Sequence, residues 1–178
     1  MTTKETMEYP NLIESKLEVY IWDDLCVIME ICKFRMNHGF RRRKKMFAAD
    51  HYAISVGNVE KSIAFYEKLD FCVIKDYQAE DGSVRIVQMK NGDFILEMFS
   101  YPDSEKLPDF VNTLGEDLKV KGAKHLGLQA QDVEKAACYL LEAGLINKMP
   151  EISKGRLGRP YFFIKDPNGI FVEIISSR

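Results

Sequence analysis

Two histidines and two glutamates in this 178-residue sequence could together bind a metal ion. Glu97 and Glu173 each lie in the middle of an apolar run that reads as a β-strand. Glutamate is a poor strand former and is rarely buried without a partner, so each carboxylate needs a compensating charge. A histidine precedes each glutamate by a similar distance, His51 by 46 residues and His125 by 48. We therefore expect one divalent cation bound by two imidazoles and two carboxylates.

Nitrogen and oxygen ligands of this kind suit zinc or nickel, and also iron, cobalt or manganese. Taken singly, a histidine at the start of a strand, or a glutamate within one, is more often an ordinary surface or core residue. The metal site is indicated by the repetition of the same spacing. The third histidine, His38, lies outside the repeat and is not included. Small residues near the ligands, such as Ala53 and Gly127, leave room for a substrate.

The region that carries these residues is built twice, with an offset of 74 residues. Each copy begins with a histidine that stands eight residues before a Val-Glu-Lys triplet. An asparagine or aspartate, Asn58 or Asp132, stands where a helix N-cap is expected. The sequence therefore predicts, in each copy, a short strand followed by a helix, at 59–69 and 133–143.

Three strands are expected after each helix. Asn91-Gly92 is a strong hairpin signal, and residues 166–169 (Asp-Pro-Asn-Gly) form a turn signal. The expected strands cover residues 71–78, 83–90 and 93–100 in the first copy, and 145–152, 160–165 and 170–176 in the second. A linker at 101–122 is expected to contain a short helix around 108–118. The predicted fold is α+β, with two βαβββ modules.

Composition and charge narrow the classes of protein. Hydrophobic residues make up 46% of the chain and the net charge is −2, which favours neither a nucleic-acid nor a membrane partner. No apolar signal core follows the N-terminus. Four scattered cysteines are expected to be reduced and buried, as in a cytoplasmic protein. Residues 1–49 are interpreted as an extension, with a helix in 11–34 and a basic linker, and 50–178 as the domain.

The sequence resembles the vicinal-oxygen-chelate superfamily, the glyoxalase, bleomycin-resistance and dioxygenase group, and looks most like small bacterial glyoxalase-I-like proteins. The resemblance covers residues 50–176. It implies that the two modules curl into an open eight-stranded cup around the metal. The segments that carry it are His51-Tyr52-Ala53-Ile54, Ser62-Ile63-Ala64-Phe65-Tyr66, Leu96-Glu97-Met98-Phe99-Ser100, Lys124-His125-Leu126-Gly127 and Asp166-Pro167-Asn168-Gly169 through Glu173.

The resemblance implies a metal-dependent lyase or isomerase of the lactoylglutathione lyase type. The motif match gives His51, Glu97, His125 and Glu173 as metal ligands, which is the glyoxalase I pattern. The substrate would be a small molecule chelated through adjacent oxygens, such as the thiol adduct of a 2-oxoaldehyde. Glu173 is the expected catalytic base, since the family's principal base lies on the last strand, and Glu97 is the second candidate. A homodimer is expected, and the modules pair either within one chain or across the dimer.

Some positions depart from the glutathione-using pattern. Ser55 and Tyr101 stand where those enzymes have an arginine and an asparagine that bind the thiol cofactor, so the thiol co-substrate stays open. Other loops carry basic residues that could bind an anion, namely Arg85, Lys154, Arg156 and Arg159. Alternatives are another metal chemistry on the same fold (a fosfomycin-type thiol transferase, an epimerase or a dioxygenase) and a non-catalytic protein that binds a small molecule or drug.

Overall fold

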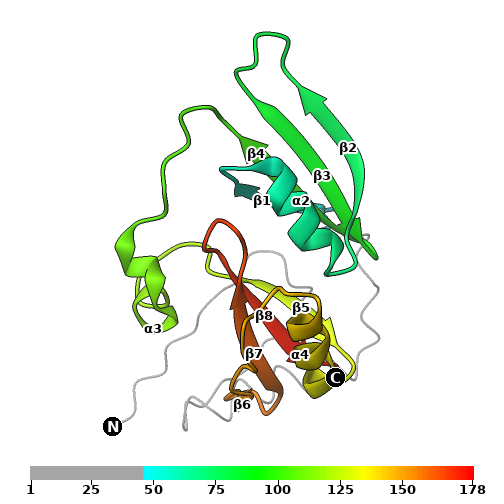
Figure 1. Ribbon diagram of the computed structural model, residues 1–178, viewed down its shortest axis with the longest axis vertical. Helices are drawn as coiled ribbons and strands as arrows, with labels where there is room; N and C mark the ends of the chain where they lie inside the picture. Colours follow the sequence, from blue (N-terminus) through cyan, green and yellow to red (C-terminus); the bar gives the residue numbers. More distant parts are fainter. Residues whose placement is uncertain (1–45) are drawn as a thin grey trace, which may run out of the picture. The chain divides into compact units, whose positions relative to one another are not determined.

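The computed structural model describes residues 46–178, of which residues 49–178 form one compact unit (Figure 1). The predicted helix in 11–34 and the basic linker lie outside the described residues, and the predicted extension stays a prediction. No helix in the described part combines the length and the apolar character needed to span a bilayer.

Two modules follow one another along the chain. The first contains β1 (His51–Ser55), α2 (Val59–Glu67), β2 (Cys72–Gln78), β3 (Arg85–Asn91) and β4 (Phe94–Ser100). The second contains β5 (Leu126–Ala130), α4 (Val133–Glu142), β6 (Ser153–Lys154), β7 (Pro160–Lys165) and β8 (Phe171–Ser176). The connection holds a 3-10 turn, η1 (Asp109–Asn112), and the short helix α3 (Leu114–Asp117), where a short helix was predicted.

Each module forms a four-stranded sheet with the same topology. The strand orders are β1-β4-β3-β2 and β5-β8-β7-β6. In each sheet the first strand of the module pairs in parallel with the last, and the other pairs are antiparallel. The predicted α+β fold of two βαβββ modules is therefore confirmed.

Both helices begin directly after the predicted N-cap residues. The Asn58 side chain accepts a hydrogen bond from the Lys61 amide at 2.8 Å, and Asp132 accepts one from the Lys135 amide at 3.0 Å. Each bond satisfies an amide that has no partner inside the helix. Equivalent caps thus fix the start of both helices relative to the strands that carry the histidines.

Two local predictions were wrong. The strand expected at 145–152 is absent, and only the two-residue β6 pairs with β7. Pro150 has no N–H to donate to a ladder, and the apolar side chains of the segment pack against the core without strand pairing. Cys72 and Cys138 are free as expected but exposed, because they lie on a solvent-facing strand and on the outer side of α4.

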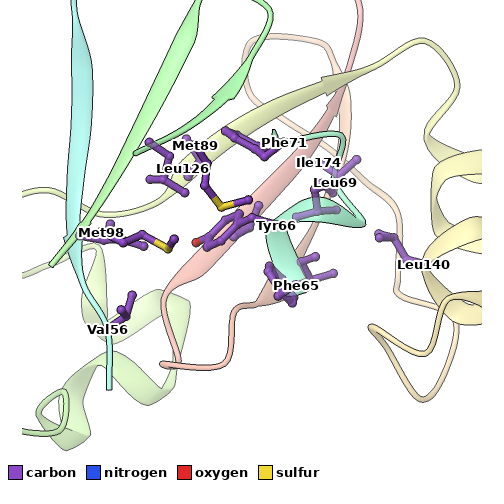
Figure 2. Packing of buried hydrophobic residues seen from close by; sticks show 14 of the residues in the cluster. Val56, Phe65, Tyr66, Leu69, Phe71, Met89, Met98, Leu126, Leu140 and Ile174 are labelled. Atoms are coloured by element: carbon purple, nitrogen blue, oxygen red, sulfur yellow. The ribbon is translucent and has the colours of Figure 1, made fainter. Parts of the chain in front are cut away.

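One hydrophobic core contains residues of both modules. Along each central strand, alternate side chains enter this core beneath the helices, so the intervening residues lie on the opposite face. In Figure 2, Tyr66 of α2 lies close to Met89 and Met98 of the first sheet. Glu97 therefore faces away from the core because its neighbours Leu96 and Met98 are fully buried.

The turn at 166–169 joins the second module to α2. Buried Asp166 accepts hydrogen bonds from the Tyr66 hydroxyl (3.2 Å) and from the amides of Asn168 and Ile170 (both 2.8 Å). Asn168 also bonds Ser62 Oγ and the Gly57 amide. Burial raises the pKa of Tyr66, so its hydroxyl keeps its proton and remains a donor. The Asp-Pro-Asn-Gly sequence thus forms a turn that also connects the modules.

Replacing Asp166 with alanine should lower the free energy of unfolding by about 2–4 kcal/mol, because it leaves a buried hydroxyl and two amides without an acceptor. Tyr66→Phe removes one of these bonds and should cost about 1 kcal/mol. Urea denaturation measures both values. In the double variant the two costs should not add, because both substitutions break the same contact. Additive costs would show that the contact contributes nothing.

Candidate metal centre

The first histidine and glutamate meet on the open face of the first sheet. Because β1 and β4 are parallel, Ala53 lies opposite Glu97, and His51 lies two residues earlier on the same face. The distance from His51 Nε2 to Glu97 Oε2 is 3.5 Å. Ala53, the residue opposite Glu97, is small and exposed.

The second pair repeats this arrangement. Gly127 lies opposite Glu173 across the parallel pair of β5 and β8, and His125 immediately precedes β5. The distance from His125 Nε2 to Glu173 Oε2 is 3.4 Å. A Cβ built at Gly127 would lie 3.7 Å from Glu173 Oε2, which is ordinary contact. Both pairs therefore come from the same two strands of the repeated module and face the same side of their sheets.

The separation within each pair fits a shared metal ion. An N–H···O hydrogen bond normally spans about 2.7–3.2 Å, so both contacts are longer than a good hydrogen bond. Imidazole nitrogen and carboxylate oxygen bind zinc at about 2.0–2.2 Å, which at a tetrahedral angle puts the two atoms about 3.4 Å apart. The observed distances of 3.5 and 3.4 Å match this value. The donor set and its spacing therefore fit a divalent cation.

The first pair has polar neighbours. Asp50 Oδ2 lies 2.9 Å from His51 Nδ1, and this hydrogen bond is the main cause that raises the pKa of His51, with a smaller contribution from Glu97. Gln88 Nε2 donates to Glu97 Oε1 at 2.8 Å. Such outer contacts orient ligand side chains, which leaves Nε2 of His51 and Oε2 of Glu97 directed toward each other.

The second pair has aromatic neighbours. The ring of Phe163, which lies opposite Glu173 in the β7–β8 register, packs edge-on against His125 with centroids 5.1 Å apart. His125 Nδ1 is buried, and no hydrogen-bond partner for it lies within residues 46–178. Glu173 accepts no hydrogen bond of normal length from any described residue. The carboxylate of the second pair is therefore less restrained than that of the first.

The two pairs do not form one cluster. In the part of the chain that the structure describes, no group of three or more histidine, cysteine, aspartate or glutamate side chains is arranged to hold a metal ion. Each module therefore brings together two of the four predicted ligand residues. The structure places the predicted set as two separate histidine–glutamate pairs, and their role as metal ligands stays a prediction.

Apolar side chains share the strand faces that carry the glutamates. Ile95, Phe99 and Ile175 are half-buried on the faces that carry the glutamates, and Phe171 is buried beside Phe163. Gln88 and Phe163 were not among the predicted site residues, although Gln88 donates a hydrogen bond to Glu97 and Phe163 lies opposite Glu173. Their relevant signal is cross-strand register, since each lies opposite a ligand glutamate.

Two of the four basic residues suggested as anion contacts are already engaged. The Arg85 guanidinium donates to Asp76 and Glu60, which raises the pKa of the arginine further. Arg159 donates to the carbonyl oxygen of Ser176. Lys154 and Arg156 are exposed. Arg85 and Arg159 therefore bond to groups of the protein itself, and neither guanidinium is free for the suggested anion contact.

Comparison with known proteins agrees with this fold. The sequence profile of the glyoxalase/bleomycin resistance protein/dioxygenase superfamily matches residues 48–174. The uncharacterized protein YwkD of Bacillus subtilis is 34% identical over 126 residues, which cover 70% of this chain and 92% of that protein. A lactoylglutathione lyase of Pseudomonas putida is 29% identical over 150 residues, covering 72% of this chain and 84% of that enzyme.

A solved structure shares the fold. The glyoxalase family protein from Enterococcus faecalis superposes with a TM-score of 0.60 at 23% identity, covering 73% of this chain and 98% of that one. The paired βαβββ modules and the profile match together define the class. This chain belongs to the glyoxalase/bleomycin resistance protein/dioxygenase superfamily.

Proposed function

We propose that this protein is a metal-dependent lyase or isomerase of the glyoxalase type, acting on a small molecule that presents two adjacent oxygens. The observation that carries the proposal is the repeated histidine–glutamate pair, with nitrogen–oxygen separations of 3.5 and 3.4 Å. Both separations suit two ligands of one cation better than a hydrogen bond. The similarity to the lactoylglutathione lyase of Pseudomonas putida supports the same class of reaction.

The proposed ligands are His51, Glu97, His125 and Glu173, and zinc or nickel is the preferred ion, with iron, cobalt or manganese as other choices. A bound divalent cation would act as a Lewis acid that stabilises negative charge developing on the substrate oxygens. The apolar side chains around the pairs would exclude water from the reacting carbons. The chain would thus supply both the ligands and a largely apolar surface beside them.

Proton transfer falls to Glu173. It would take the proton from the carbon that bears the thiol adduct and return it to the neighbouring carbon. Glu97 is the second candidate, but its Oε1 accepts the hydrogen bond from Gln88. The Glu173 carboxylate has no such bond within residues 46–178 and lies beside the aromatic ring of Phe163. The less restrained carboxylate is the better one to leave a ligand position and accept a proton.

The separation of the two pairs supports an assembly of two chains. Two ligands from one module leave a zinc ion short of the four that it usually takes. A two-fold dimer in which the first pair of each chain meets the second pair of its partner would complete two equal sites. We therefore propose a homodimer with metal sites shared between chains. Free Cys72 and Cys138 are in keeping with a reducing, cytoplasmic setting, where a thiol co-substrate stays reduced.

The purified full chain should contain about one divalent cation per chain, since a shared dimer has two sites for two chains. Nickel- or zinc-loaded protein should isomerise the adduct of methylglyoxal with glutathione, bacillithiol or another small thiol. Elemental analysis and a coupled absorbance assay measure the two properties. A chelator should abolish turnover, and readdition of metal should restore it.

The same experiment separates the other classes of function. Metal-loaded protein that turns over none of the adducts would contradict the glyoxalase assignment and point to a different metal chemistry. Protein that never binds a divalent cation would contradict both the glyoxalase assignment and the other metal chemistries. It would instead indicate a module that binds a small molecule without turnover.

A further inference from the structure

One row of side chains crosses the first sheet from the candidate ligands to its outer strand. Across successive strands, Ala53 lies opposite Glu97, Glu97 opposite Gln88, and Gln88 opposite Lys75. Directly opposed residues point to the same face of a sheet. Two strand spacings of about 4.8 Å separate the backbone of Lys75 from that of Glu97 by about 10 Å. Lys75 therefore stands at the far end of the row that begins at a metal ligand.

A hollow follows this row. It has a volume of about 200 Å³ and is lined by Lys75, Tyr77, Ile86, Gln88 and Glu97. Tyr77 and Ile86 oppose each other one row further along and give the hollow an apolar side. The Gln88–Glu97 hydrogen bond closes its polar end. A short chain extending from the carboxylate end to the ammonium group would thus pass over Gln88, with Tyr77 and Ile86 as an apolar wall at its side.

Within residues 46–178, no acidic side chain pairs with Lys75. No carboxylate among residues 46–178 lies within 4.0 Å of its Nζ, whereas Arg85 on the neighbouring strand contacts two. The corresponding row of the second module runs from Gly127 through Glu173 to Phe163, which takes the place of Gln88. The short strand β6 pairs only with Pro160 and Tyr161, so no cation among the described residues stands opposite Phe163 in the place of Lys75. The hollow beside Glu97 therefore has a single positive group at one end, and only one of the two modules supplies it.

We propose that Lys75 binds an anionic group, a carboxylate or a phosphate, on the substrate or on its thiol part. This inference rests on the proposed function, since the other end of the substrate would sit at the metal ligands. The anionic group would lie roughly 6–10 Å from the chelated oxygens, because the Lys75 side chain spans part of the distance between the strands. Neutral and cationic molecules of the same length would be disfavoured at this position.

The test compares three hydroxamic acids of equal chain length that end in a methyl, a carboxylate or a phosphonate group. Each presents two adjacent oxygens to a metal. Isothermal titration of the zinc-loaded full chain measures their Kd values, and the zinc content of every sample is determined beforehand. Lys75→Gln should reduce the preference for one of the anionic probes over the methyl probe by about three- to tenfold. The larger change identifies the preferred anion.

Two further variants serve as controls. Lys75→Arg keeps the charge and should keep the preference. Lys61 is an exposed residue of α2, the helix that packs on the opposite side of the sheet. Lys61→Gln therefore removes one positive charge away from the hollow and should leave the preference unchanged. An unchanged preference in Lys75→Gln, or an equal loss in Lys61→Gln, overturns the role of Lys75 alone. If wild-type protein fails to bind zinc, the proposed function is overturned, and this inference with it.

Discussion

Glu173→Gln should lower kcat by about 10²–10⁴-fold, which is the usual contribution of a positioned general base. Glutamine keeps the shape of the side chain and one oxygen that can bind a cation, but it cannot accept the proton. The residue lies in the middle of β8, between Val172 and Ile174, both of which are buried in the core. Because the substituted side chain faces away from that core, the free energy of unfolding should change little. Steady-state kinetics and urea denaturation measure the two effects.

The matched control is Glu97→Gln, which makes the same chemical change in the first module. Its carboxylate already accepts a hydrogen bond from Gln88, so we expect it to serve mainly as a fixed ligand. The variant should bind metal more weakly but lose less activity than Glu173→Gln once metal is saturating. Full activity of Glu173→Gln at matched metal content would rule out its role as base. The reverse order of the two variants would move that role to Glu97.

Much of the fold was predictable because its signals are local and occur twice. Asn58 and Asp132 fixed the helix starts, and the matching histidine spacing revealed the duplication. The pairing of each histidine with its glutamate was also predictable in outline. In both modules the strand that begins the unit pairs with the strand that ends it, which brings residues almost 50 positions apart onto adjacent strands.

The surroundings of the carboxylates were not predictable from the same signals. The residue opposite each glutamate is set by the register of the hairpin that contains it, β3–β4 for Glu97 and β7–β8 for Glu173. A shift of one residue in β3 would replace Gln88 with a core side chain. The missing strand at 145–152 shows a related limit. Its apolar residues do mark burial, but burial alone does not distinguish strand pairing from irregular packing against a core.

The assembly is the property that the sequence predicts least well. The sequence pattern of a module is the same whether the module packs against its neighbour in the same chain or against a module of another chain.

Two complementary variants distinguish these cases. One carries His51→Ala and Glu97→Ala, and the other carries His125→Ala and Glu173→Ala. Each alone destroys one of the two pairs. If sites are shared across a dimer, each variant alone should bind no metal tightly and show no turnover.

Mixing restores function only if sites are shared. When the two variants are unfolded and refolded together in equal amounts, half of the dimers should contain one chain of each kind. In such a dimer, one site combines both damaged pairs and the other combines both intact pairs. About a quarter of the wild-type metal sites, and of the activity, should therefore return. Refolding each variant separately is the control, and a mixture with no more metal than either variant alone would contradict sites shared between chains.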